Sequence, residues 1–195
     1  MTNSMLIHKI VGLGSALLTR QFFGQKSASL LSLQDHSHSN TTTSLTPCEM
    51  LSTRQLTKLF EPICVYSGAL LTDLTYSREH IFPVSRLKTQ AARSDPHNVY
   101  PCDIAINLKR SSYRFTDGPD MLISHKQKIF VPPQTPSRGI IARTCLRMQA
   151  VHGVDLHKVI DEVTLRAWLE QYPDVTAYEK RHWAVIEVYG QKVQQ

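Results

Sequence analysis

The stretch "YSREHIFPVS", residues 76–85, constrains this chain more than any other stretch of its sequence. It places an acid, Glu79, directly before a histidine, His80, with Arg78 on one side and Pro83 on the other. The weak alternation of polar and apolar residues predicts a β-strand. A carboxylate beside an imidazole on one strand is usually a coincidence, so the residues that follow decide whether this pair is a site.

Residues 76–115 read as a strand, a loop, a second strand and a helix. The second strand is "HNVYPCD", and we expect Pro101 to mark its end because proline cannot donate to a β-ladder. The helix is predicted over "DIAINLKRSSYRF", with Asp103 as its N-cap. Two strands and a helix in this order can bring the acid–histidine pair and Asn107 together at one end of the unit.

These three side chains suit the cleavage of a phosphodiester bond. A carboxylate and an amide oxygen are ligands for a hard cation such as Mg²⁺, which neutralises charge on the scissile phosphate and the leaving 3′ oxygen. An imidazole beside them can take a proton from the attacking water. Residues 76–115 also carry seven basic residues against three acids, which favours phosphate contact over a merely solvated surface.

The ordered residues of this region resemble the endonuclease I family of His-Me finger (ββα-metal) nucleases. That family writes the region as R-E-H-x-x-P-x-S, then D-x-H-N-L-x-P, then N-x-x-R-S. The matching residues here are Arg78, Glu79, His80, Pro83, Ser85, Asp95, His97, Asn98, Pro101, Asn107, Arg110 and Ser111. The resemblance implies an α+β fold, with a His-Me finger ββα-metal core and additional helices packed around it.

The resemblance also implies roles for single residues. His80 would be the general base, and Glu79 with Asn107 would hold one Mg²⁺, for which Mn²⁺ can substitute. The residues implied to contact phosphate are Arg78, Arg110 and Arg143. The residues implied to support the hairpin are Asp95, His97 and Asn98. Arg143 is assigned because "RGIIARTCLRMQ" is similar to the family's R-G-x-x-A-R helix, and a buried salt bridge is its alternative role.

Further helices are predicted around this unit. A short one, "LSTRQLTKLFEPI", should end at Pro62, and "CVYSGALL" should be a strand leading to a turn at Gly68. Downstream, "IIARTCLRMQAVHG" should close at Gly153, "LHKVIDEVTLRAWLEQY" should run to Pro173, and "AYEKRHWAVIEVYG" should end at Gly190. The chain departs from the family at its end, which reads "GQKVQQ" instead of Q-G-N-x-N-P-F.

The first part of the chain has a different composition. Residues 1–34 carry three basic residues and no acid, as in a transit peptide directing a protein to the mitochondrion or another organelle. A secretory signal core, a disordered tail or a soluble viral or intracellular protein are the alternatives. The run "IVGLGSALL" is far shorter than the ~20 residues that span a bilayer. Residues 35–47 read as a Ser/Thr-rich linker, so the endonuclease I-like domain is expected over 48–190.

Charge and cysteine content narrow the classes of function. The net charge of +6 suits a polyanionic partner, and the four cysteines include no C-x-x-C pair, which argues against a structural zinc and for free thiols. The leading hypothesis is a metal-dependent endonuclease acting on nucleic acid, DNA ahead of RNA, with no membrane span. The alternative is a catalytically silent nuclease-fold protein, serving as a structural or RNA-binding subunit of an organellar assembly such as a mitochondrial ribosome. The sequence carries no indication of oligomeric state.

Overall fold

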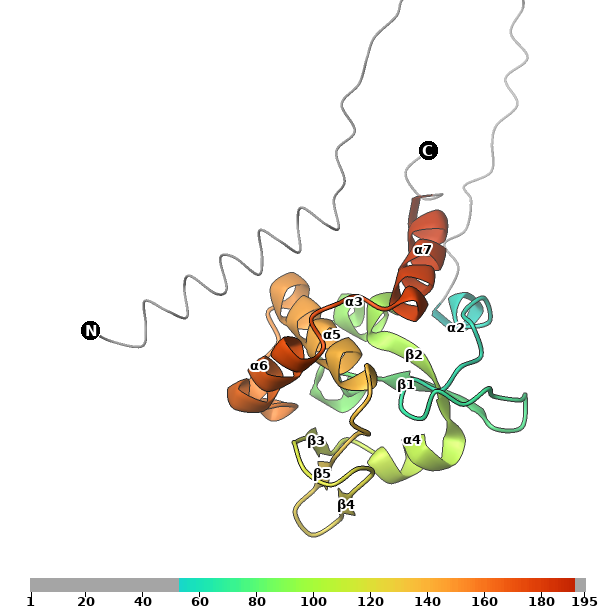
Figure 1. Cartoon of the computed structure of the whole chain (residues 1–195). Helices are drawn as coiled ribbons and strands as arrows, with labels where there is room; N and C mark the ends of the chain where they lie inside the picture. Colours follow the sequence, from blue (N-terminus) through green and yellow to red (C-terminus); the bar gives the residue numbers. More distant parts are fainter. Residues whose placement is uncertain (1–52, 192–195) are drawn as a thin grey trace, which may run out of the picture. The chain divides into compact units, whose positions relative to one another are not determined.

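Two antiparallel strands form the central hairpin of the molecule (Figure 1). They are β1, Tyr76–His80, and β2, Val99–Asp103, and their register pairs Glu79 with Tyr100 and His80 with Val99. Because successive side chains of a strand point to opposite faces, Glu79 lies on the face that carries Tyr100, and His80 lies on the other. The two strands predicted within residues 76–103 are therefore present. The strand predicted over "CVYSGALL" was wrong, because only an isolated bridge pairs Ile63 with Leu70, around the turn at Gly68.

The prediction that Pro101 ends the second strand was wrong, because Pro101 lies inside β2 opposite Arg78. The carbonyl oxygen of Pro101 accepts a hydrogen bond from the Val65 N–H at 2.9 Å, on the side away from β1. The missing N–H of the proline also points to that side, so it removes no hydrogen bond between β1 and β2. Proline is tolerated at such an outer position of a sheet.

Helix α4, Ile104–Arg110, follows β2 without a loop. The predicted N-cap is confirmed, since the Asp103 carboxylate accepts from the N–H groups of Ala105 and Ile106 at 2.8 and 3.2 Å. The helix ends earlier than predicted. Ser111 takes a positive φ of 52°, which turns the chain out of the helix and into strand β3, Arg114–Phe115.

A second, smaller sheet was not predicted from the sequence. Its strand order is β3-β5-β4, with β4 at Ile123–Ser124 and β5 at Ile129–Phe130, and β3 runs parallel to β5. Each of its strands has two residues, too few to show a period of alternation in the sequence. The connection between β1 and β2 holds three short helical turns: η1, Val84–Arg86; α3, Gln90–Arg93; and η2, Pro96–Asn98.

The remaining helices are α2, Thr53–Leu56; α5, Ser137–His152; η3, Leu156–Lys158; α6, Glu162–Gln171; and α7, Ala177–Gln191. Gly153 ends α5 as predicted, with a left-handed φ of 62°. The predicted helix from 156 to 172 is split, because the Asp161 side chain accepts from the Thr164 N–H at 2.8 Å and caps a new helix, α6. The predicted stop at Gly190 was wrong, since α7 continues to Gln191.

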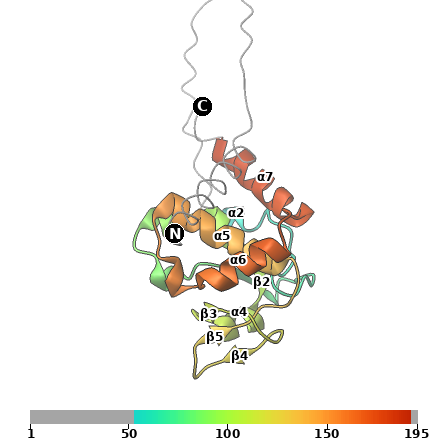
Figure 2. The same cartoon turned by 60° about the vertical axis from the view of Figure 1, so that its left-hand side comes forward.

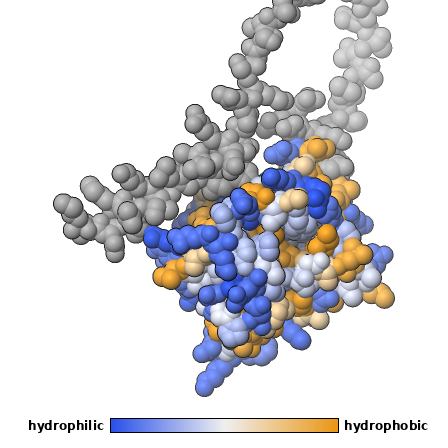
Figure 3. Space-filling model, in the orientation of Figure 1, coloured by the Kyte–Doolittle hydropathy of each residue, from blue (hydrophilic) through white to orange (hydrophobic). Residues whose placement is uncertain are grey.

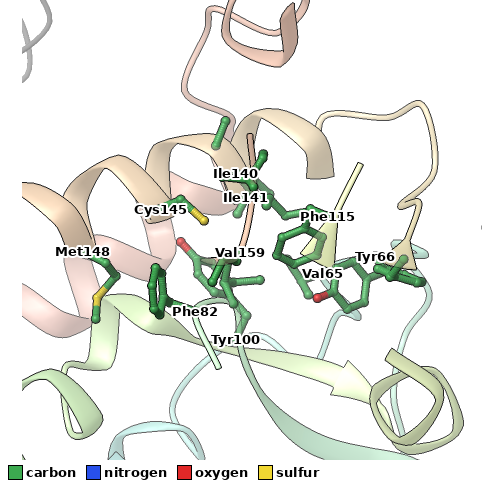
Figure 4. Close-up of a cluster of buried hydrophobic side chains, with 14 of the residues drawn as sticks. Val65, Tyr66, Phe82, Tyr100, Phe115, Ile140, Ile141, Cys145, Met148 and Val159 are labelled. Carbon is green, nitrogen blue, oxygen red and sulfur yellow. The ribbon is translucent and has the colours of Figure 1, made fainter. Parts of the chain in front are cut away.

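The core lies between α5 and the hairpin. Side chains of α5, such as Ile141, Cys145 and Met148, pack with Phe82 and Tyr100 (Figure 4). Helices α5 and α6 lie on one side of the hairpin, and α4 lies toward the small sheet (Figure 2). This packed layer holds β1 and β2 against α5.

The computed structural model describes residues 53–191, so the predicted targeting segment and linker lie outside the described residues. Within 53–191, no helix is long and apolar enough to cross a membrane. On the face drawn in Figure 3, apolar side chains are scattered among hydrophilic ones. The described cysteines, Cys64, Cys102 and Cys145, are buried thiols, and the Sγ atoms of Cys64 and Cys102 lie 3.9 Å apart.

Candidate active site

Glu79 is a buried carboxylate, with only 2% of its surface exposed. Two donors reach the same oxygen of this side chain: the Tyr66 hydroxyl lies 2.6 Å from Oε1, and Nη1 of Arg110 lies 2.9 Å from Oε1. No residue in the described part of the chain donates a hydrogen bond to Oε2. Burial raises the pKa of Glu79 above its ordinary value, although Arg110 and Tyr66 both act to lower it. The cost of burying the ionised carboxylate therefore exceeds the stabilisation that Arg110 and Tyr66 give it.

Asn107 lies on the face of α4 that packs along the outer edge of β1. Its amide nitrogen donates to the hydroxyl of Ser77 and to the carbonyl oxygen of Arg78, both at 3.0 Å. These bonds fix the amide so that its carbonyl oxygen, Oδ1, is left without a hydrogen bond among the described residues. Asn107 thus contacts the two residues of β1 that directly precede Glu79.

His80 is half-buried on the opposite face of β1 from Glu79. Burial lowers the pKa of His80, a hydrogen bond to the backbone of Arg93 raises it, and the cations of Arg78 and Arg110 lower it further. The net effect is a lowered pKa, so the imidazole is neutral at neutral pH and able to accept a proton. The side chains of Glu79 and His80, adjacent on β1, point to opposite faces of the strand.

Asn98 joins the two ends of the hairpin connection. It is fully buried, and its side chain accepts from the Phe82 N–H at 2.7 Å and donates to the Phe82 carbonyl at 2.9 Å. This pair of bonds holds the chain in place two residues after His80. Removing the amide would leave two buried backbone groups without partners.

Asp95 connects the hairpin to the end of α5. Its carboxylate contacts Nδ1 of His97 at 3.1 Å and Nε2 of His152 at 2.8 Å. Burial alone would raise the pKa of Asp95, but His97, His152 and Arg147 outweigh it and hold the pKa well below the usual range. The three residues for which we predicted a supporting role thus make contacts of that kind.

The predicted phosphate ligands do not lie together on the surface. Arg78 is exposed, but Arg110 is 1% exposed and donates to the carbonyl oxygens of His80 and Ile81, at 3.0 and 2.6 Å. Arg143 is also buried, at 7% exposure, and is paired with Glu179. Arg143 thus forms the buried salt bridge that we gave, from the sequence, as the alternative to phosphate contact.

Tyr66 was missed by sequence reasoning. Its sequence context, "CVYSG", contains no charged residue and no pattern that separates it from an ordinary core tyrosine. Its contact with Glu79 joins residues 13 positions apart in the sequence, and it exists only because the chain folds back along β2. Two further cations, the half-buried Arg86 and the exposed Arg114, were likewise not assigned a role. Burial lowers the pKa of Arg86, and the nearby cations of Arg110 and Arg114 lower it further.

The donors present suit a hard divalent cation. Within the described residues no donor reaches Oε2 of Glu79 or Oδ1 of Asn107, and Asn107 contacts the two residues that precede Glu79. These are the oxygen types that Mg²⁺ binds with few protein ligands and several waters. No cluster of three or more His, Cys, Asp or Glu residues suited to a metal lies within 53–191.

Comparison with known proteins identifies the family of this chain. The family Endonuclease I, a family of His-Me finger nucleases, matches residues 23–192. A periplasmic deoxyribonuclease of Aeromonas hydrophila is 34% identical over 88 residues, which cover 40% of this chain and 37% of that protein. An extracellular deoxyribonuclease of the same organism is 33% identical over 88 residues, covering 40% of this chain and 38% of that protein.

The match to the family spans most of the chain and includes the whole hairpin, α4 and the helices behind them. The chain therefore belongs to the Endonuclease I family. The aligned part is less than two fifths of the length of the two deoxyribonucleases, so their names describe proteins of which this chain matches only a segment.

Proposed function

We propose that this protein is a metal-dependent endonuclease that hydrolyses phosphodiester bonds in DNA. β1, β2 and α4 then form its His-Me finger core. The observation that carries the proposal is a buried Glu79 carboxylate with only Oε1 engaged among the described residues, directly after the two residues, Ser77 and Arg78, that orient the amide of Asn107. Membership of the Endonuclease I family and the deoxyribonuclease relatives support DNA as the substrate.

Glu79 and Asn107 would hold the Mg²⁺ ion, through Oε2 and Oδ1. When bound, the ion supplies positive charge that stabilises the phosphate and the leaving 3′ oxygen. Arg110 holds Glu79 in place from behind rather than touching phosphate, since its guanidinium is buried against β1. Its remaining hydrogen bonds go to backbone carbonyls, which ties α4 to the strand that carries the site.

His80 is proposed to accept the proton of the attacking water. Its lowered pKa, caused mainly by burial, leaves it neutral at neutral pH. A positioned general base of this kind contributes on the order of 10²–10⁴ in rate. In this step the proton moves from water to an unprotonated ring nitrogen of His80.

Phosphate contact is assigned to the cations that remain at the surface. Arg78 is exposed and directly precedes Glu79, and Arg93 in the connection between β1 and β2 and Arg114 in β3 are exposed as well. Arg86 is half-buried and uses Nη2 to donate to the Ser112 carbonyl at 2.7 Å, which leaves other guanidinium donors free to turn outward. Such contacts bind the nucleic acid backbone without reading its sequence.

The periplasmic and extracellular relatives favour a secreted protein, which was an alternative reading of the first 34 residues. They give no support to the mitochondrial interpretation. A secreted nuclease also differs from a silent organellar subunit in needing Glu79, His80 and Asn107 together, and all three are present.

The test is nicking of supercoiled plasmid DNA by the full chain with Mg²⁺ or Mn²⁺. We expect His80→Ala to lose about 10²–10⁴ in rate while its fold and Mn²⁺ affinity stay those of the wild type. His157→Ala, an exposed histidine on η3, is the control and should cleave normally. Wild-type protein that nicks neither DNA nor RNA would overturn the proposed activity and favour the structural subunit, and full activity in His80→Ala would remove His80 as the base.

A further inference from the structure

We infer that Tyr66 is a positioning residue that keeps one oxygen of Glu79 open for the metal ion. This inference rests on the proposed function, because it concerns the affinity of the same site. Tyr66 is 1% exposed, and its hydroxyl lies 2.6 Å from Oε1 of Glu79. It is outside the motif that carries the catalytic residues, and it reaches the site through a different segment of the chain.

The hydroxyl of Tyr66 has little freedom to move. The preceding residue, Val65, donates its N–H to the carbonyl oxygen of Pro101 in β2 at 2.9 Å, which anchors the segment to the outer edge of the hairpin. The Tyr66 ring packs edge-on against Phe130, with ring centroids 5.0 Å apart, and lies 6.4 Å from Phe115 (Figure 4). The position of the donor is therefore set by the sheet edge and the core together.

The Tyr66 hydroxyl and the Arg110 guanidinium both contact one oxygen of Glu79, Oε1. Arg110 approaches Oε1 at 2.9 Å, and its guanidinium is able in principle to engage both oxygens of a carboxylate side by side. Arg143 does this with Glu179, where Nε and Nη2 contact the two oxygens at 2.8 and 2.7 Å. With the Tyr66 hydroxyl in place, Glu79 instead keeps Oε1 toward both donors, and Oε2 remains free.

Loss of the Tyr66 hydroxyl should therefore make Oε2 of Glu79 unavailable to the metal ion while the fold is kept. In Tyr66→Phe the ring packing is kept, but nothing holds Glu79 against rotation toward Arg110, and Oε2 is drawn into a paired arrangement. Loss of an outer partner of a metal-binding carboxylate typically costs 10–100-fold in metal affinity. We expect a loss of about this size here, with cleavage largely restored at saturating Mn²⁺.

The experiment is a Mn²⁺ titration of the full chain by isothermal calorimetry, on wild type, Tyr66→Phe and Tyr100→Phe. Tyr100 is the matched control: it is equally buried and lies opposite Glu79 across the hairpin, but its hydroxyl contacts Thr144, at 3.4 Å. Thermal unfolding of each variant is recorded beside the titration, which is carried out well below the lowest transition. We expect Tyr100→Phe to bind Mn²⁺ as the wild type does, whatever its change in stability.

Each outcome decides the matter. Weaker Mn²⁺ binding confined to Tyr66→Phe supports the inference. Wild-type affinity in Tyr66→Phe overturns it while leaving the proposed nuclease function intact, and so does an equal weakening in both variants, which would indicate a general loss of packing. Wild-type protein that binds no Mn²⁺ overturns the proposed function, and the inference falls with it.

Discussion

Two buried arginine–glutamate pairs, one at the hairpin and one behind it, show how the same two residue types serve different ends. In the scaffold pair, Arg143 engages both oxygens of Glu179, and Thr176 adds further hydrogen bonds to Oε2. In the hairpin pair, Arg110 and Tyr66 reach only Oε1 of Glu79. The scaffold carboxylate is saturated with donors, while the hairpin carboxylate has one oxygen to offer.

This difference separates a group built for stability from a group built for binding. A saturated buried pair gains little from a further cation, because both carboxylate oxygens already accept hydrogen bonds and a cation neutralises the charge. An unsaturated one remains poorly compensated, as the raised pKa of Glu79 indicates, and a divalent cation would relieve that deficit. Both pairs hold helices in place, but only the hairpin pair leaves a carboxylate oxygen that can bind a metal ion.

The largest effect should come from breaking the scaffold pair. Arg143→Met leaves the Glu179 carboxylate buried without its cation, which typically costs about 3–5 kcal/mol in the free energy of unfolding. Arg166→Met removes an exposed partner of Glu162 on α6 and should cost well under about 1 kcal/mol. Urea unfolding of both variants gives the comparison. Arg143→Met at wild-type stability would show that this pair does not hold α7 to α5.

A second effect should come from His182, which lies on α7 and stacks on Tyr100 with ring centroids 4.2 Å apart. Burial and nearby His97 lower the pKa of His182 to about 3, against weak opposition from the Pro96 backbone. The unfolded chain takes up this proton near pH 6.5, so stability is present above that pH and is lost as the pH falls toward the folded pKa. The loss from this residue alone is about 3 kcal/mol by pH 4.

The variant His182→Phe tests this directly, because phenylalanine fits between Phe60 and Tyr100 and cannot be protonated. Its unfolding free energy should depend less on pH between about 6.5 and 4 than that of the wild type. Asp95 also contributes stability that is lost in acid. Because its folded pKa is lowered, that contribution is lost only below the pKa of an aspartate in the unfolded chain, about 3.9. Identical pH profiles for wild type and variant would contradict the account of His182.

Substitution of the proposed metal ligands should change the free energy of metal binding by less than the stability changes above. Glu79→Gln and Asn107→Ala each remove or weaken one proposed ligand, and we expect Mn²⁺ to bind about 10–100-fold more weakly. Added Mg²⁺ should restore part of the cleavage rate in both variants, because the base is intact. Glu179→Gln is the matched change in the saturated pair. If it weakened Mn²⁺ binding as much as Glu79→Gln does, the distinction between the two pairs would be lost.

The smallest effect is expected from a single surface cation. Arg78→Ala should weaken DNA binding only a few-fold and lower the salt dependence of log affinity by about 0.9, as for one lost phosphate contact. Arg110→Met should leave the salt dependence unchanged, since Arg110 is buried, and should affect stability and metal affinity instead. Affinity that stays flat across salt in the wild type would show that the basic residues of this region do not contact the phosphates.

The local parts of this fold were predictable from the sequence, and the long-range parts were not. The strand carrying Glu79 and His80 and the cap at Asp103 follow from alternation and from side-chain chemistry within a few residues. The early end of α4 depends on Ser111 adopting a positive φ, which the run "RSSYRF" does not reveal. Propensity and spacing also overlooked the break before α6, where Asp161 starts a new helix.

The candidate site divides in the same way. The ordered motif identifies Glu79, His80 and Asn107, but not which face of a strand each one takes or which partners surround it. The resemblance assigned Arg110 to phosphate, and a position in a motif does not show whether a side chain is buried. The burial of Arg110 arises from packing against Phe115 and β1. Tyr66 lies outside the motif, and only the folded chain shows that it contacts Glu79.

The central claim is that Oε2 of Glu79 and Oδ1 of Asn107 hold the metal ion. A crystal of the full chain grown with Mn²⁺ tests it directly through the anomalous signal of the metal. The account predicts one peak within about 2.0–2.3 Å of both oxygens, the range for hard cations of this size, with waters completing the shell. A peak bound instead by Asp95, His97 or His152, or a Glu79 carboxylate paired through both oxygens with Arg110 and no peak beside it, would contradict the account.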